Sequence, residues 1–171
     1  MFTKNTYLVK ERVGFLKLAD VFDIFEADTG QQVAIAIEKP GALIHFLRFL
    51  INKQLLPTTV HICATVDSPP ILSIRRGFTL LRSRVQVIAG DGRSLGYFKS
   101  KVFSLGGGFH VYDNADQLVA DIKGDWKGWN FRFLDKDGAE LGQVSKKWGG
   151  IAKELFTSAD NYVIHVNEGQ P

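Results

Sequence analysis

The chain has 171 residues, 45% of them hydrophobic, which predicts one globular domain over residues 1–171 with a sizeable core and excludes a disordered protein. Its net charge of +3 is small, so nucleic acid is not an expected partner, although a pI of about 9.0 favours anionic surfaces such as lipid headgroups. The single cysteine, Cys63, excludes an internal disulfide and a cysteine-rich zinc site.

The N-terminal stretch MFTKNTYLVKERVG has no apolar segment of the kind found in signal peptides. Cys63 lies in the stretch TVHICATV, whose β-branched residues indicate a strand. We expect its thiol to be buried and inert rather than a reactive nucleophile. Both observations predict a reducing, cytoplasmic setting for the protein.

The first predicted elements are a hairpin and a helix. Residues 22–39 alternate between apolar and polar side chains on both sides of an Asp-Thr-Gly turn, which is the pattern of two antiparallel strands. Residues 41–56 form a broad apolar face, interrupted at helical spacing by His45, Arg48 and Asn52, which predicts an amphipathic helix. This helix is too short to span a bilayer, so we expect it to pack against the sheet, with a place in the membrane interface as the alternative.

A pair of arginines follows the helix. Arg82 and Arg84 are two residues apart, so a strand would project both side chains to one side. Two neighbouring guanidinium groups suit a phosphate, which they can hold through paired hydrogen bonds. We expect Arg75, Arg76 and Arg93 to join them across neighbouring hairpins. The alternative is a solvated basic face whose charges pair with Asp and Glu.

An internal repeat dominates the second half of the chain. Each copy has an alternating strand, a turn rich in Asp, Asn or Gly, a leucine that opens a second strand, and a lysine near its end. The leucines recur every 23 residues, at Leu95, Leu118 and Leu141. The copies are residues 85–101, 109–125 and 131–147. Successive hairpins without helices between them predict an antiparallel barrel or sandwich, and not a parallel α/β fold.

Three tryptophans, Trp126, Trp129 and Trp148, stand beside glycines around the last of these hairpins, whose turn is Asp137-Gly138. Glycine lets a large ring lie over the neighbouring backbone, so packing within the hairpin is the favoured interpretation. The alternative is a surface on which these rings bind a ligand or a partner.

No pattern in the sequence indicates catalysis. The glycine-rich stretch SLGGGFHVYD lacks the Gly-Lys-Ser/Thr ending of a phosphate-binding loop and leads into a strand. The four histidines are far apart and lack the spacing of metal ligands. Neither a nucleophile elbow nor a dinucleotide-binding fingerprint is present. We therefore expect a non-enzymatic protein.

The motifs IRRGFTLLRSRVQV, GQVSKKWGG and ELFTSADNY occur in this order within residues 15–166. Their combination resembles the phospholipid scramblase-like proteins and, more widely, the LURP-one-related and tubby-like superfamily. The resemblance implies a closed antiparallel β-barrel of about twelve strands around a hydrophobic C-terminal helix. It also implies association with membranes or phosphoinositides. Tubby-like relatives use basic strand residues for such headgroups, so the arginines become a predicted lipid-headgroup site.

Two features depart from the family pattern. The family's apolar C-terminal segment has no counterpart after NYVIHV, so either the sequence is a fragment, or the barrel is filled by the helix at 41–56 or by elements exchanged in a homodimer. The calcium-binding segment of the scramblases corresponds to the stretch that starts at Ser158, where only Asp160 and Asn161 remain at suitable ligand positions. We therefore expect no tight calcium site and no other cofactor.

The sequence thus predicts a non-catalytic, cytoplasmic β-barrel, peripheral at the membrane, that binds anionic lipid headgroups. The expected binding residues are Arg75, Arg76, Arg82, Arg84 and Arg93. The alternative function is a module that binds a protein partner or forms a homodimer. Calcium-dependent phospholipid scrambling ranks last, because these residues contain no segment long and apolar enough to span a membrane.

Overall fold

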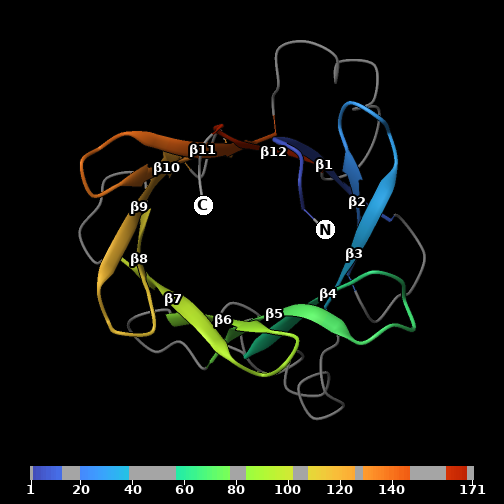
Figure 1. The fold of residues 1–171 in the computed structure, drawn as a ribbon, viewed down its shortest axis with the longest axis horizontal. Helices are drawn as coiled ribbons and strands as arrows, with labels where there is room; N and C mark the ends of the chain where they lie inside the picture. The colour runs from blue at the N-terminus through green and yellow to red at the C-terminus, as the bar shows by residue number, and fades with distance from the viewer. Residues whose placement is uncertain are drawn as a thin grey trace, which may run out of the picture.

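Twelve antiparallel strands form a closed barrel. The computed structural model describes residues 2–12, 20–38, 57–77, 84–101, 108–125, 129–146 and 161–168. In Figure 1 the strands follow one another around a ring in chain order, and β1 closes the ring by pairing with β12. The predicted closed barrel is therefore confirmed, whereas the helix predicted at 41–56 lies outside the described residues.

Each strand pairs with its neighbours in sequence, and the seam between β1 and β12 completes the cylinder. In that seam Leu8 lies opposite Val163. The strands are β1 (Thr6–Glu11), β2 (Val21–Glu26), β3 (Gln32–Glu38), β4 (Thr58–Cys63), β5 (Pro70–Arg76), β6 (Arg84–Ala89), β7 (Ser94–Ser100), β8 (Gly108–Tyr112), β9 (Leu118–Asp125), β10 (Asn130–Asp135), β11 (Glu140–Ser145) and β12 (Asn161–Val166).

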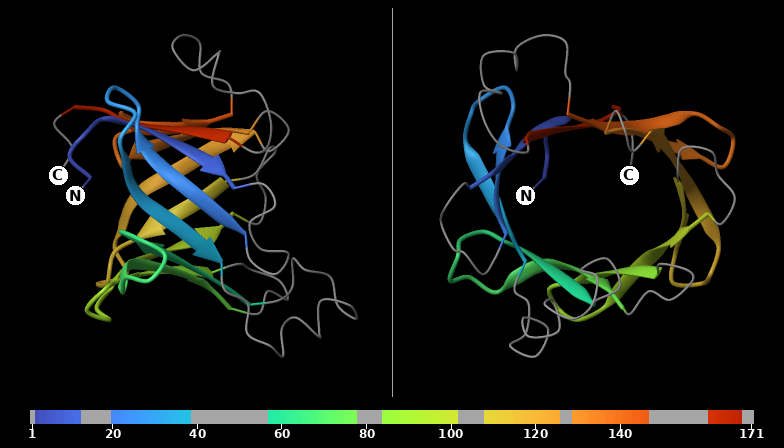
Figure 2. Two further views of the ribbon diagram at one scale, coloured as in Figure 1. Left: turned by 90° about the vertical axis from the view of Figure 1, so that its right-hand side faces the viewer. Right: turned by 180° about the vertical axis from the view of Figure 1, so that it is seen from behind.

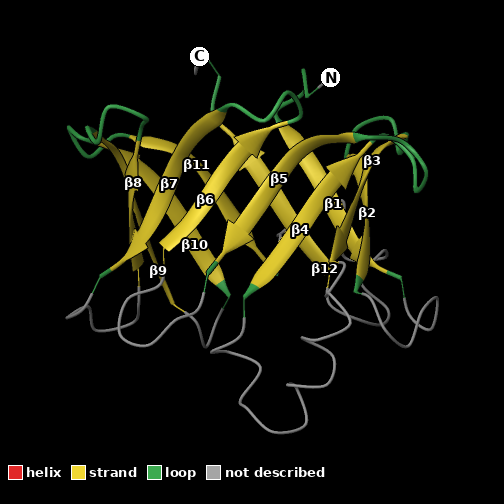
Figure 3. Cartoon of the chain, turned by 90° about the horizontal axis from the view of Figure 1, so that it is seen from below, coloured by secondary structure: helices red, strands yellow, loops and turns green. Residues whose placement is uncertain are grey.

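The two ends of the barrel differ in their connections. Five short connections join β2 to β3, β4 to β5, β6 to β7, β8 to β9 and β10 to β11 at one end, which we call the turn end. Both termini also lie there, as Figure 3 shows. The remaining neighbouring strands are joined at the opposite end, which we call the connection end.

Local turn chemistry explains the five hairpins. In each of them the register shifts beside the turn, as at a β-bulge. Four of the turns contain one residue with a left-handed backbone, namely Gly30, Gly92, Asp116 and Gly138. The hairpins predicted from the 23-residue repeat are β6–β7, β8–β9 and β10–β11, and all three are confirmed.

Strand alternation gives the barrel two faces, one of which carries apolar side chains on every strand. This face includes, in strand order, Val9, Ile24, Ala34, Ile62, Leu72, Val87, Phe98, Val111, Ile122, Phe133, Val144 and Ile164. We assign it to the inside of the barrel, because a closed barrel shields its inner face from water.

Two observations support this assignment. Seen along the barrel in Figure 1, the N-terminal segment bends from the start of β1 toward the middle of the ring, and the side view of Figure 2 places it just beyond the ends of the strands. Phe2 of that segment packs edge to face on Tyr7, with ring centroids 5.4 Å apart. Tyr7 shares the face of Val9. Among the described strand residues, the exposed charged side chains all belong to the opposite face: Arg75, Arg84, Lys123, Asp125 and Arg132.

The outward face differs between the two halves of the barrel, and its buried apolar clusters lie in one of them. On β1 and β12, Leu8 and Val163 form a buried outward cluster, and Val21, Ile35 and Ile37 form a second one on β2 and β3. The free thiol of Cys63 on β4 is buried in the same half. The outward face of β5 to β10 is mainly polar, and it carries the candidate site.

Candidate anion-binding surface

The outward face of β6 to β10 places positive side chains directly opposite one another. Arg84 on β6 pairs in register with Lys99 on β7, and Lys99 pairs with His110 on β8. Lys123 on β9 pairs with Arg132 on β10. Like charges directly opposite each other destabilise an antiparallel pair. Barrel stability therefore does not explain the arrangement.

Two further cations complete a group that we call the basic surface. Arg75 on β5 lies opposite Gln86, so it is a diagonal neighbour of Arg84, at about 7–8 Å between such positions. Lys101 shares the face of Lys99, two positions away. The basic surface consists of Arg75, Arg84, Lys99, Lys101, Lys123 and Arg132. Five of these cations are at outward strand positions of β5 to β10, where the described acids are Asp121 and Asp125. Glu140, at the start of β11, also lies 4.0 Å from Arg132.

A stacked pair of tyrosines positions Arg84. Its guanidinium carbon lies 3.7 Å from the ring centroid of Tyr97, and Tyr97 stacks on Tyr112 with centroids 5.0 Å apart. The Tyr97 hydroxyl donates a hydrogen bond of 2.9 Å to Asp116, and this bond raises the pKa of Tyr97. The guanidinium is thus held by a cation–π contact while the side chain of Arg84 stays exposed.

Asp121 neutralises part of the basic surface. Its carboxylate oxygens lie 2.6 Å from Nδ1 of His110 and 3.1 Å from Nζ of Lys101. Desolvation by itself would raise the pKa of Asp121, but the hydrogen bonds and charges of Lys101 and His110 outweigh it, so the pKa is lowered. The resulting stabilisation is complete above the pKa of the unfolded carboxyl, about 4, and is lost as the pH falls through the lower pKa of the folded state.

Replacing Asp121 by asparagine should move stability and anion binding in opposite directions. The loss of charge-assisted hydrogen bonds to Lys101 and His110 should cost about 1–2 kcal/mol in the free energy of unfolding. The added unit of positive charge should raise affinity for anionic vesicles about fivefold. Urea denaturation and vesicle co-sedimentation measure the two quantities. A fall in both would show that Asp121 serves only the fold.

The arginines predicted as one site are only partly brought together. Arg75 and Arg84 lie on the basic surface as diagonal neighbours. Arg76 follows Arg75 in the same strand and therefore points inward. Arg93 lies in the turn between β6 and β7, and Arg82 lies outside the described residues. The sequence-predicted set is thus spread over three places in the described barrel.

Four members of the basic surface are absent from the predicted site: Lys99, Lys101, Lys123 and Arg132. The signal for the lysines is the lysine near the end of each repeat copy. It becomes informative only once the register between strands is known, because register decides which side chains lie opposite each other.

Trp129 combines packing with exposure at the connection end. Its ring lies 6.3 Å from the ring of Phe131 and 5.5 Å from that of Tyr162, and Nζ of Lys146 lies 4.7 Å from its centroid. The backbone φ of +49° is unusual for a bulky residue, and the residue is 38% exposed. Part of the ring is thus packed, and part is accessible to a partner.

The structure describes one of the two predicted calcium ligands. Asn161, the first residue of β12, is buried and lies opposite Lys10, whose positive charge opposes a cation there. Asp160, like Trp126 and Trp148, lies outside the described residues. Within the described ranges no group of three or more His, Cys, Asp or Glu side chains could hold a metal ion. The same part of the chain contains no helix long and apolar enough to cross a membrane.

Comparison with known proteins connects this barrel to one family. The family model described as Scramblase matches residues 18–168, which is most of the chain. Neither the curated proteins nor the solved structures contain a significant match. The family match spans all the described strands except β1 and therefore includes the whole basic surface.

Proposed function

Since this chain belongs to the Scramblase family, we propose that it is a non-catalytic, cytoplasmic protein that binds anionic lipid headgroups at the membrane surface through its basic surface. The family match confirms the resemblance to scramblase-like proteins that the sequence motifs predict. Lipid binding itself is our proposal, and it starts from the chemistry of the outward-facing cations.

The like-charged pairs across neighbouring strands carry this proposal. Arg84 and Lys99 repel each other in the free protein, as do Lys123 and Arg132. An anion placed between them relieves that repulsion, so part of the cost of the arrangement is recovered only on binding. Phosphate and carboxylate groups of lipids supply such anions, and guanidinium groups bind them through paired hydrogen bonds.

Vesicle co-sedimentation tests the proposal directly. The purified protein should sediment with phosphatidylcholine vesicles that contain phosphatidylserine or a phosphoinositide, and much less with phosphatidylcholine alone. Binding should weaken as salt rises, because the Debye length shrinks from about 10 Å at 0.1 M to about 3 Å at 1 M. Equal recovery on neutral and anionic vesicles would contradict the proposal.

An exposed apolar area favours a second candidate, a module that binds a protein partner or a second copy of the chain. Leu95, Leu118 and Val119 are 41–44% exposed and lie at the turn end of β7 and β9. Leu95 and Val119 line a hollow together with Phe98 and Val111 of the inward face, so this apolar area lies at the mouth of the barrel. Such an area suits a protein interface. Light scattering coupled to gel filtration decides this candidate, because a lasting dimer would support it and a monomer at micromolar concentration would oppose self-association.

A further inference from the structure

The two ends of the barrel differ in charge in the described part of the chain. The five short connections at the turn end hold two cations, Arg93 and Lys136, within the residues that the structure describes. The same five connections contain six aspartates: Asp28, Asp67, Asp91, Asp113, Asp116 and Asp137. Four further acids lie beside these connections or after β12, namely Glu26, Asp135, Glu140 and Glu168. The turn end is therefore strongly acidic.

Hydrogen bonds hold several of these carboxylates in place. Asp113 accepts the backbone N–H groups of Ala115 and Gln117 at 2.8 and 2.9 Å, and Asp135 accepts those of Asp137 and Ala139 at 2.8 Å each. These bonds explain why the turns use aspartate. They also fix the negative charge at this end, because the carboxylates cannot turn away without breaking the turns.

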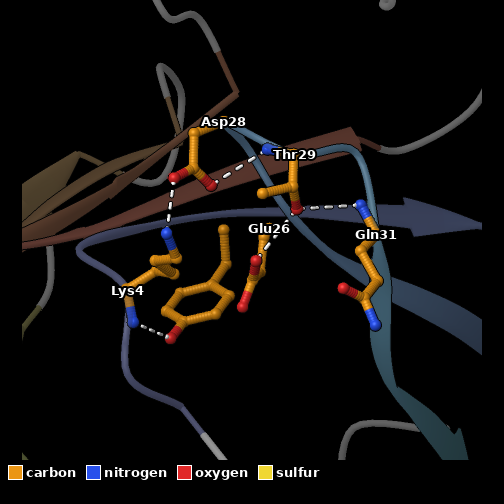
Figure 4. A network of polar contacts seen from close by, with 6 residues as sticks. Lys4, Glu26, Asp28, Thr29 and Gln31 are labelled. Carbon is orange, nitrogen blue, oxygen red and sulfur yellow. Dashed lines mark hydrogen bonds and ion pairs between the residues drawn. The ribbon is translucent and has the colours of Figure 1, made fainter.

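Part of the little positive charge at the turn end is already neutralised. Figure 4 shows Lys4, just before β1, with its Nζ 2.9 Å from an oxygen of Asp28. The other oxygen of Asp28 accepts the backbone N–H of Thr29, and the Thr29 hydroxyl donates to Glu26 at 2.9 Å. Lys4 is thus engaged within the acidic end and adds no net attraction for an anion.

At the connection end the described cations outnumber the described acids, which include Glu11, Asp20, Glu38 and Asp125. All six cations of the basic surface lie in the half of their strands nearer to this end, or just beyond it. Trp129, Tyr162 and Lys146 form a cluster at the same end, with Lys146 Nζ 4.7 and 5.2 Å from the two ring centroids. Tryptophan, tyrosine and lysine are the residues that concentrate where a protein meets the headgroup region of a bilayer.

We propose that the barrel docks on an anionic lipid surface in one orientation, with the connection end and the basic surface toward the lipid and the turn end away from it. This inference rests on the proposed function and adds its geometry. Attraction of the basic surface and repulsion of the acidic turn end both favour the same orientation. Both termini lie at the turn end and therefore face away from the lipid.

The turn end offers the competing orientation. Six of the exposed large apolar side chains lie there: Phe2, Val66, Leu95, Leu118, Val119 and Val166. They would favour insertion into a neutral bilayer, but they cannot approach an anionic one without bringing the aspartates of the turns with them. The lipid charge therefore decides between the two orientations.

Site-specific quenching measures the orientation. In a Cys63→Ala background, single cysteines are introduced at four exposed, uncharged positions and labelled with a small fluorophore. Gln86→Cys and Asn130→Cys report on the basic surface and the connection end, whereas Ala115→Cys and Ala139→Cys report on the turn end. The vesicles contain phosphatidylserine and a lipid with a nitroxide on its headgroup, which quenches only at short range.

The expected result is quenching several-fold stronger at positions 86 and 130 than at 115 and 139. Co-sedimentation of the same labelled proteins separates the two ways of failing. Binding with equal quenching at all four positions, or with stronger quenching at the turn end, overturns the orientation and leaves the proposed function standing. Absence of binding to anionic vesicles overturns the proposed function and the orientation with it.

Discussion

Reversing the charges of Arg84 and Lys99 to glutamate should reduce affinity for anionic vesicles on the order of 100-fold or more. Each cation near an anionic membrane contributes about 1 kcal/mol, and the double substitution changes the local charge by four units. Each 1.4 kcal/mol of binding free energy changes the dissociation constant about tenfold. Co-sedimentation would therefore detect even half of the expected loss of binding free energy. The fold should survive, since Arg84 and Lys99 are opposite each other on the outward face and two acids would repel each other about as two cations do.

A matched control separates the basic surface from the net charge of the protein. Arg93→Glu with Lys136→Glu makes the same formal change at the turn end. If the basic surface binds lipid, this control should change affinity for anionic vesicles by no more than about threefold. The substituted positions at the turn end would then stay more than a Debye length from the membrane. Equal losses in the two double variants would mean that only net charge matters, and no loss in the first would remove Arg84 and Lys99 from the site.

Replacing Gly124 by alanine should destabilise the barrel strongly, although the substitution adds only one methyl group. Gly124 on β9 lies opposite Phe131 on β10, and Phe131 is buried. A Cβ at Gly124 would come within 2.2 Å of Phe131 Cδ1 and 2.6 Å of the Asn130 carbonyl oxygen. Overpacking of this kind costs about 1–3 kcal/mol and sometimes more, which is a large part of a typical stability of about 5–15 kcal/mol.

Gly138→Ala serves as the comparison for that substitution. Gly138 has a φ of +89° and nothing within 4 Å of an added Cβ, so alanine there suffers only backbone strain, about 1 kcal/mol. Urea denaturation of both variants gives the difference in the free energy of unfolding. If Gly124→Ala were no less stable than Gly138→Ala, then Phe131 would not lie over Gly124 in solution.

The hairpins were predictable from sequence because their causes are local. Alternating side chains and Asp/Gly turns lie within about 17 residues of each other in each repeat copy, such as residues 85–101. The closing of the barrel has no local sequence signal, because the seam between β1 and β12 joins residues as far apart as Thr6 and His165. The prediction of about twelve strands came from the resemblance to scramblase-like proteins, and the barrel confirms it.

The candidate site was less predictable because it depends on register. Alternation alone shows that Arg75 and Arg76 face opposite sides. It does not show that Arg84 lies opposite Lys99. A regular hairpin continuing from the Ile88–Ser94 pair would place Arg84 opposite Phe98, and the shift between Val87 and Ile88 moves Lys99 into that position. The sequence contains no clear signal for this shift, so the pairing of cations emerges only from the structure.

The seam between β1 and β12 also has a consequence for how the chain reaches its native state. Eleven of the twelve strand pairings link neighbours in sequence, so hairpins can form early and add to one another at small entropic cost. The last pairing joins the two ends of this ribbon, and until it forms, β1 and β12 present unsatisfied backbone groups that invite intermolecular association. Once the ends meet, no edge remains, and a second molecule has no strand to extend.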